Sequence, residues 1–172
     1  MTSQAADSQL RVVASGQRDL VLNRAFAAPA PLVFATLTRP NLLRRWHGAN
    51  GWQLTVCEVD LRVGGAWRFV SSGPDGAEME MRGLFREVEP PVRLVQTEIR
   101  DDWTDGAALV TTVLDEADGR TAMTVTVQYS TTEIRDLVLR SPMERGAGEA
   151  YERLAAELTT LTPNSRNERP DS

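Results

Sequence analysis

Lysine is absent from this sequence, and all 19 basic side chains are arginines. A catalytic lysine that forms a Schiff base and the lysine of a phosphate-binding loop are therefore excluded. The single cysteine, Cys57, cannot form an internal disulfide, so nothing requires an oxidising compartment. The single histidine, His47, excludes a metal site built from several histidines. These absences remove several common enzyme classes.

Long apolar runs and an excess of positive charge are also missing. No run approaches the ~20 apolar residues of a membrane-spanning helix, and residues 1–16 lack the basic and apolar segments of a secretory signal. The formal net charge of −5 argues against nucleic-acid and anionic-membrane partners, which need a basic face. We therefore expect a cytoplasmic protein that binds neither nucleic acid nor membrane.

The chain is long enough for one domain with a substantial core. Its hydrophobic fraction of 41% and charged fraction of 25% are typical of globular proteins. Residues 1–17 and 163–172 are small, polar and without periodicity, which predicts a disordered tail at each end. The sequence thus predicts a single domain at residues 18–162.

Apolar spacing predicts the elements of this domain. A strand is expected at residues 19–26, and two short helices follow, opened by Pro29 and Pro31 and by Pro40. The apolar period then becomes two, and turn-rich connections separate six further expected strands at residues 54–60, 66–72, 78–88, 93–100, 107–116 and 120–129. Short strands joined by short turns favour an antiparallel sheet.

Two helices are expected at the end of the domain. Ser130 and Glu133 form a capping box for the first, whereas Ser141 and Pro142 begin a second helix that can reach residue 161. Apolar residues three and four apart give this last helix one apolar face, and the sheet is the only element large enough to cover it. The predicted class is therefore α+β, with an antiparallel sheet wrapped around a long C-terminal helix.

Alternation along the strands predicts which side chains face the interior. It indicates a sheet with one dry and one wet face, although the strand at residues 107–116 is ambiguous. The side chains expected inside are Cys57, Val59, Trp67, Phe69, Met79, Met81, Phe85, Val95, Ile99, Met123, Val125, Val127 and Tyr129. Of these only Cys57 and Tyr129 titrate. General acid–base catalysis needs a positioned histidine or carboxylate, so this interior favours a binding protein over an enzyme.

Two features that could carry chemistry are expected to be structural. His47 follows Trp46 at a helix end, where we expect a surface or capping role, with a role at a pocket mouth as the alternative. The acidic segment at residues 101–105 lacks the ligand spacing of a calcium loop and is expected to be a solvated hairpin tip. No motif calls for a catalytic residue, a metal or a cofactor.

Aromatic and methionine side chains could either fill the core or line a ligand cavity. If a cavity exists, its expected ligand-binding residues are Trp46, Trp52, Trp67, Phe69, Met81, Phe85, Met123, Tyr151 and Leu154. Gly146 and Gly148 are unusual inside a helix, and they fit either a loose first turn or a helix that passes over a cavity.

Six segments stand out together: RAFAAP at residues 24–29, VFA at 33–35, PNLLRRW at 40–46, DLRVGGAWR at 60–68, GLFREVEP at 83–90 and MERG at 143–146. In this order they resemble the bacterial proteins related to the activator of the ninety-kilodalton heat-shock protein's ATPase, over residues 19–161. The resemblance implies the helix-grip fold of the SRPBCC superfamily, which includes the birch pollen allergen and the START lipid-transfer domains. In that fold a curved antiparallel sheet grips the C-terminal helix, two short helices close one end, and a cavity commonly binds hydrophobic or aromatic molecules.

Three functional hypotheses follow. The first is non-enzymatic binding of a small hydrophobic or aromatic molecule between the C-terminal helix and the sheet. The second is a polyketide cyclase, dehydratase or hydrolase for an aromatic substrate, which would need a polar cavity group such as His47, Arg82, Thr97 or Tyr129. The third, which the resemblance implies, is a chaperone- or protein-interaction module. Edge strands could also pair two copies into a homodimer.

Overall fold

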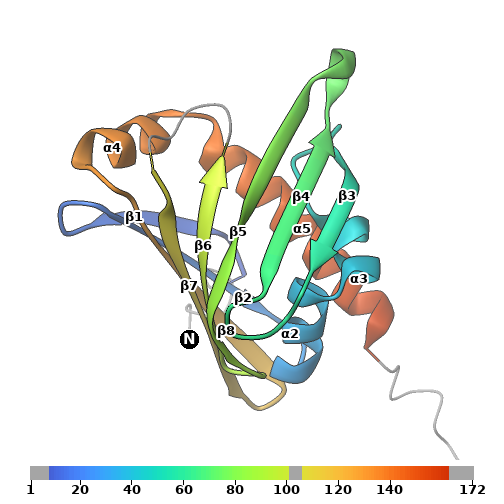
Figure 1. Cartoon of the computed structure of the whole chain (residues 1–172). Coiled ribbons are helices and arrows are strands. Elements are labelled where there is room, and N and C mark those ends of the chain that lie inside the picture. The colour runs from blue at the N-terminus through green and yellow to red at the C-terminus, as the bar shows by residue number, and fades with distance from the viewer. Residues whose placement is uncertain (1–7, 101–105, 163–172) are drawn as a thin grey trace, which may run out of the picture.

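A curved antiparallel sheet forms the body of the molecule (Figure 1). The computed structural model describes residues 8–100 and 106–162. Within these residues the strands are β1 (Arg11–Ser15), β2 (Asp19–Phe26), β3 (Gln53–Val59), β4 (Ala66–Ser72), β5 (Glu78–Glu89), β6 (Arg93–Arg100), β7 (Ala108–Ala117) and β8 (Arg120–Gln128). They follow the spatial order β1-β2-β8-β7-β6-β5-β4-β3, so β1 and β3 form the two edges.

The α-helices of the described chain are α2 (Ala30–Thr38), α3 (Pro40–Trp46), α4 (Thr132–Arg140) and α5 (Met143–Leu161), and a short 3-10 helix, η1 (Pro74–Gly76), lies between β4 and β5. α2 and α3 carry the chain from β2 to β3 at the far edge, and both contact α5. α5 lies across the concave face of the sheet (Figure 1). The fold is therefore the α+β helix-grip fold. Within the described residues, no helix is both long and apolar enough to cross a membrane.

The core lies between α5 and the concave face of the sheet. Leu20 on β2 and Leu154 on α5 have no exposed surface, and Phe26 and Leu158 each expose 2%. Fully burying one such side chain stabilises the folded state by about 1.5–3 kcal/mol. Apolar residues spaced by four on α5 therefore hold the helix against the sheet.

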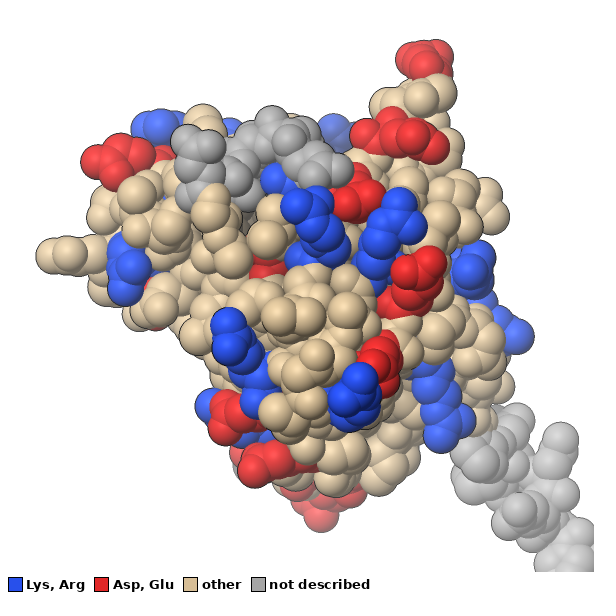
Figure 2. Space-filling model, in the orientation of Figure 1, with Lys and Arg blue, Asp and Glu red and all other residues tan. Residues whose placement is uncertain are grey.

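The convex face of the sheet is solvated and carries paired charges. Glu80 on β5 accepts hydrogen bonds from Arg68 on β4 at 3.1 Å and from Arg82 at 3.0 Å. In the space-filling view, basic and acidic side chains are interspersed rather than gathered by sign (Figure 2). Such pairs occupy the outward positions that alternate with apolar, inward ones along these strands.

The expected tail at residues 1–17 is partly wrong, because it contains β1. All five residues of β1 pair with β2 in an antiparallel register. Only Val12 among them is partly buried, so the strand gives almost no alternation signal. Residues 1–7 and 163–172 lie outside the described residues, as does the acidic segment 101–105.

The expected cap of α4 is also wrong by one residue. The N-cap is Thr131, whose Oγ1 accepts a hydrogen bond from Ile134 N at 3.1 Å, rather than Ser130. Serine and threonine are both good N-cap residues, so two adjacent candidates leave the first turn undetermined from sequence alone.

The expected orientation of β6 is reversed. Val95 and Ile99 are expected inside, whereas the structure places Leu94, Glu98 and Arg100 on the concave side. The reason is that Leu94 and Val95 are consecutive and both buried, at 6% and 5% exposure. Where both faces of a strand are covered, apolar alternation does not identify the inner face.

A buried arginine ties α5 to β2. Arg24 exposes 6% of its surface, and its Nη1 donates to Glu152 Oε1 on α5 at 2.7 Å. The guanidinium also lies 5.2 Å from the ring centroid of Phe26. Its Nε is buried and has no hydrogen-bond partner among the described residues. The guanidinium is buried although the Glu152 side chain is 67% exposed, so this cation depends on its contact with Glu152 for compensation.

Glu152→Gln should destabilise the folded protein by about 1–3 kcal/mol, because the buried guanidinium of Arg24 loses its negative partner. Urea unfolding followed by circular dichroism measures the change. Glu87→Gln is the matched control: Glu87 pairs with Arg93 at 3.1 Å, but both side chains are exposed. Removing this exposed ion pair should lower the free energy of unfolding by less than about 1 kcal/mol. Equal losses would contradict an anchoring role for Arg24.

Candidate functional site

A cavity of about 360 Å³ lies between α5 and the concave face of the sheet. Side chains from α3, from α5 and from most of the strands line it, and the majority of these side chains are apolar. Small-molecule sites commonly occupy roughly 300–1,000 Å³ and have mostly apolar walls. The size and lining of this cavity are therefore suited to a small ligand.

Small residues in the first half of α5 leave this space open. Gly146, Ala147 and Ala150 line the cavity. Further along the same helix, Leu154 and Leu158 are buried in the core and fill the interior. The first of the two unusual helix glycines thus lies in the cavity wall, as expected for a helix that passes over a cavity.

Most of the expected ligand-binding residues border this cavity. The lining contains Trp46, Trp52, Trp67, Phe69, Met81, Met123 and Tyr151. The other two, Phe85 and Leu154, are outside the lining; they expose 3% and 0% and pack within the core. Both point inward as expected, but the interior around them is filled.

Hydrogen bonds fix two indole rings in the cavity wall. Trp46 Nε1 donates to the carbonyl oxygen of Thr36 at 2.9 Å, and Trp67 Nε1 donates to that of Thr97 at 3.1 Å. The second bond passes over β5 at Gly83, where any Cβ would collide with the Thr97 carbonyl oxygen. The protein itself therefore holds both rings, as a preformed site requires.

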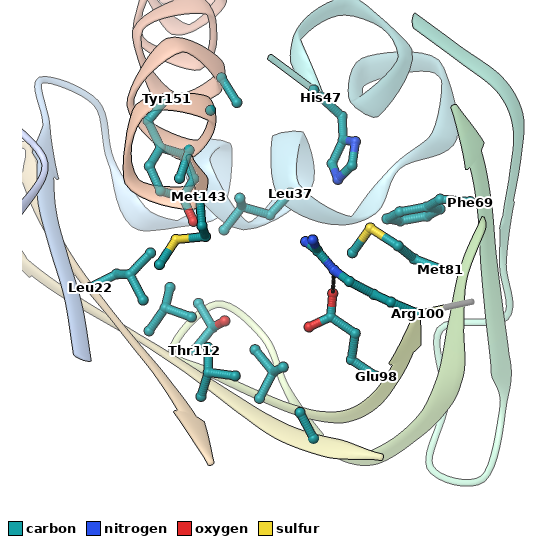
Figure 3. A pocket seen from close by; sticks show the side chains of 18 of the residues that line it. Leu22, Leu37, His47, Phe69, Met81, Glu98, Arg100, Thr112, Met143 and Tyr151 are labelled. Carbon is teal, nitrogen blue, oxygen red and sulfur yellow. Dashed lines mark hydrogen bonds and ion pairs between the residues drawn. The ribbon is translucent and has the colours of Figure 1, made fainter. Parts of the chain in front are cut away.

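One side of the cavity is polar. Figure 3 shows His47, at the end of α3, pointing into the cavity above Arg100 and Glu98 of β6. Arg100 Nε donates to Glu98 Oε1 at 3.5 Å, and these two side chains expose 29% and 16%. The His47 ring packs edge-on against Phe69, with ring centroids 5.1 Å apart. A histidine, an arginine and a carboxylate therefore lie together in a mostly apolar interior.

Burial keeps the His47 imidazole neutral. Loss of solvation, reinforced by the positive charges of Arg100 and Arg153, lowers its pKa from 6.5 to about 4. Its Nδ1 is buried and has no hydrogen-bond partner in the described part of the chain. A neutral imidazole has one donor and one acceptor nitrogen. His47 thus combines both expected roles: its backbone N–H donates to the carbonyl oxygen of Leu43 at the C-cap of α3, and its side chain lines the cavity.

Two tyrosines add hydroxyl groups to the lining. Burial, together with the negative charge of Glu98, raises the pKa of Tyr129 and of Tyr151 to about 12. Both phenols therefore keep their protons at neutral pH and can donate hydrogen bonds. Tyr129 follows β8 and Tyr151 lies on α5, so the cavity has donors on two of its walls.

Sequence reasoning missed Glu98 and Arg100 because the inner face of β6 was assigned from Val95 and Ile99. The signal that identifies them is Leu94, an apolar residue in phase with the polar side chains of β6. When one face of a strand carries apolar residues first and charged residues after them, the charged residues can lie in a cavity rather than in solvent. The position of Leu94 therefore indicates the inner face of β6, but a count of alternating apolar residues does not reveal it.

The polar groups that an enzyme would need are only partly in place. His47 and Tyr129 line the cavity. Thr97 instead accepts a hydrogen bond from Leu84 N at 2.9 Å on the outer side, and Arg82 pairs with Glu80. Among the described residues, no three His, Cys, Asp or Glu side chains gather as a metal site would require.

The sheet gripping a long helix over an interior cavity defines the class: a helix-grip protein of the SRPBCC superfamily. The family described as Activator of Hsp90 ATPase homolog 1-like protein matches residues 27–159. This chain belongs to that family.

Solved structures from several bacteria share the fold. A Rhodobacter sphaeroides protein is 35% identical, covers 89% of this chain and 99% of its own, and has a TM-score of 0.84. A Nitrosomonas europaea protein is 26% identical, with coverages of 87% and 99% and a TM-score of 0.75. The AHSA1 protein of Silicibacter pomeroyi is 25% identical, with coverages of 84% and 99% and a TM-score of 0.70. Among proteins of curated function, none matches this chain.

Protonation of His47 can be followed without ambiguity, because the chain has one histidine. In the folded protein its NMR resonances should stay unchanged from about pH 8 to about pH 5.5 and move only toward the pKa of about 4. The unfolded chain protonates this residue near 6.5, so stability should fall as the pH drops from 6.5 to about 4. His47→Phe should remove that part of the acid sensitivity. A midpoint near 6.5 in the folded protein would mean a solvated imidazole.

Proposed function

We propose that this protein binds a small, largely apolar molecule, aromatic or aliphatic, in the cavity between α5 and the sheet. The observation that supports the proposal best is a space of about 360 Å³ with a mostly apolar wall and a few polar groups. Apolar ligand surface buried there is worth about 25 cal/mol per Å², less the cost of immobilising the ligand. The indole rings of Trp46 and Trp67 are already fixed by hydrogen bonds, so binding does not add the cost of ordering them.

Binding is better supported than general acid–base catalysis. A catalytic acid or base works best when its pKa lies near the working pH. The pKa of His47 is about 4 and that of Tyr151 is about 12, so both lie far from neutrality. Each group is suited to hydrogen bonding a ligand and poorly suited to exchanging protons with it at neutral pH.

Native mass spectrometry of the purified protein, beside the same sample under denaturing conditions, tests the proposal. We expect a small molecule that departs on unfolding. Protein freed of that molecule should take up the fluorescent probe N-phenyl-1-naphthylamine and gain thermal stability, because a ligand that binds only the folded state stabilises it. A bare protein that neither binds the probe nor gains stability would contradict the proposal.

Val110→Phe on β7 should block the probe, because Val110 lines the cavity and a larger ring there occupies ligand space. We expect at least ~10-fold weaker binding of N-phenyl-1-naphthylamine by fluorescence titration, about 1.4 kcal/mol, with an unchanged circular dichroism spectrum. Val113→Phe is the matched control, the same change on the same strand at a side chain that is 37% exposed. Equal effects of the two substitutions would place the probe outside the cavity.

A further inference from the structure

A purely apolar ligand would offer no hydrogen-bond partner to the polar side chains on one side of the cavity. Figure 3 shows Leu22 and Met143 on one side, and His47, Glu98 and Arg100 on the other. The side of Leu22 and Met143 also carries the hydroxyl groups of Tyr151 and Thr112, but it is mostly apolar and suits the body of a ligand (Figure 3). The polar side loses access to water when a ligand closes it off, and an unsatisfied buried polar group then costs about 1–3 kcal/mol. A ligand that is polar at one end avoids that cost.

His47 brings one ring nitrogen to the polar side of the cavity. The ring lies among apolar neighbours, with the rings of Trp46 and Phe69 at centroid distances of 5.5 and 5.1 Å, and its Nδ1 is buried without a hydrogen-bond partner among the described residues. The other ring nitrogen points in the direction of Arg100 (Figure 3). A ligand atom placed between the imidazole and the guanidinium would contact both.

The charges around this point favour an oxygen atom with free lone pairs. Arg100 and Arg153 both act electrostatically on His47. Arg153 is fixed there, because its Nη1 donates to the carbonyl oxygen of Gly48 at 3.2 Å. A guanidinium only donates hydrogen bonds, so it favours an acceptor atom of the ligand and repels a cation. Glu98 balances part of the positive charge, which lets an uncharged acceptor fit as well as an anion.

We propose that the ligand carries a carbonyl or carboxylate oxygen at one end, held between the His47 imidazole and the Arg100 guanidinium, with its apolar body toward Leu22 and Met143. This inference rests on the proposed function and specifies the ligand class. The guanidinium donates a hydrogen bond to the oxygen, and the neutral imidazole donates a second one from its N–H. Glu98 positions Arg100 by accepting from its Nε.

Four naphthalenes of similar size test the proposal by displacing N-phenyl-1-naphthylamine: 2-acetylnaphthalene, 2-naphthoate, 2-isopropylnaphthalene and 2-(aminomethyl)naphthalene. The ketone and the carboxylate should bind at least ~10-fold tighter than the hydrocarbon, and the cationic amine should bind the weakest. A ratio of ketone to carboxylate affinity above or below one identifies a neutral or an anionic natural ligand. Hydrocarbon or amine binding as tight as that of the ketone would overturn the proposal.

Two variants test whether Arg100 and His47 cause the preference for a ligand oxygen. Arg100→Met should reduce the ketone-to-hydrocarbon affinity ratio by about tenfold, since one strong donor is lost. Arg93→Met is the matched control, the same change on β6 at an exposed side chain paired with Glu87, and should leave the ratio unchanged. His47→Phe keeps a ring against Phe69 and should also reduce the ketone-to-hydrocarbon affinity ratio. This second variant tests the proposal even if Arg100→Met does not fold.

The outcomes separate this inference from the proposed function. If no naphthalene displaces the probe and the probe itself does not bind, the proposed function fails. If all four bind, with ratios that are the same in the wild type, Arg100→Met and His47→Phe, the cavity binds ligands but the oxygen-acceptor proposal is wrong. A ratio that falls in these variants and not in Arg93→Met supports it.

Discussion

The curvature of the sheet is the constraint on which the rest of the molecule depends. Its concave face offers more apolar surface than one helix can cover, because a helix with its side chains is about 10–12 Å across. Leu154 and Leu158 fill the groove along the second half of α5, whereas Gly146, Ala147 and Ala150 leave the first half open. Protein interiors are otherwise close-packed, so an empty apolar space costs stability that a bound molecule can restore.

Burial also determines the chemistry of that space. The same loss of solvation that lowers the pKa of His47 raises that of Tyr129 and Tyr151, so all three groups stay uncharged over a wider range of pH than in water. Glu98 and Arg100 stay acceptable in this interior because they pair with each other. The cavity therefore offers hydrogen bonds with little net charge, which selects a ligand by where its polar atoms lie more than by how much charge it carries.

Much of the fold could be predicted from the sequence, because strand alternation, proline-opened helices and the apolar face of α5 are local signals. The position of the cavity could be predicted only in part. The alternation along a strand shows which side chains point inward. Whether such a side chain meets an empty space or another side chain depends on the residues that face it from the other side of the interior. Phe85 and Leu154 therefore point inward and are core, whereas Trp67 and Met81 point inward and line the cavity.

The polar side of the cavity was the hardest part to predict, for a related reason. A charged side chain on a strand is assigned to solvent because burying an isolated charge is costly, and that rule holds for most strands of this sheet. The rule fails at Glu98 and Arg100 because the opposite charges of the two side chains offset the cost of burying each other, and because the cavity beside them is open. Relatives that share the fold at 25–35% identity need not share this pair. The ligand therefore follows from these few side chains, and the family accounts only for the scaffold that holds them.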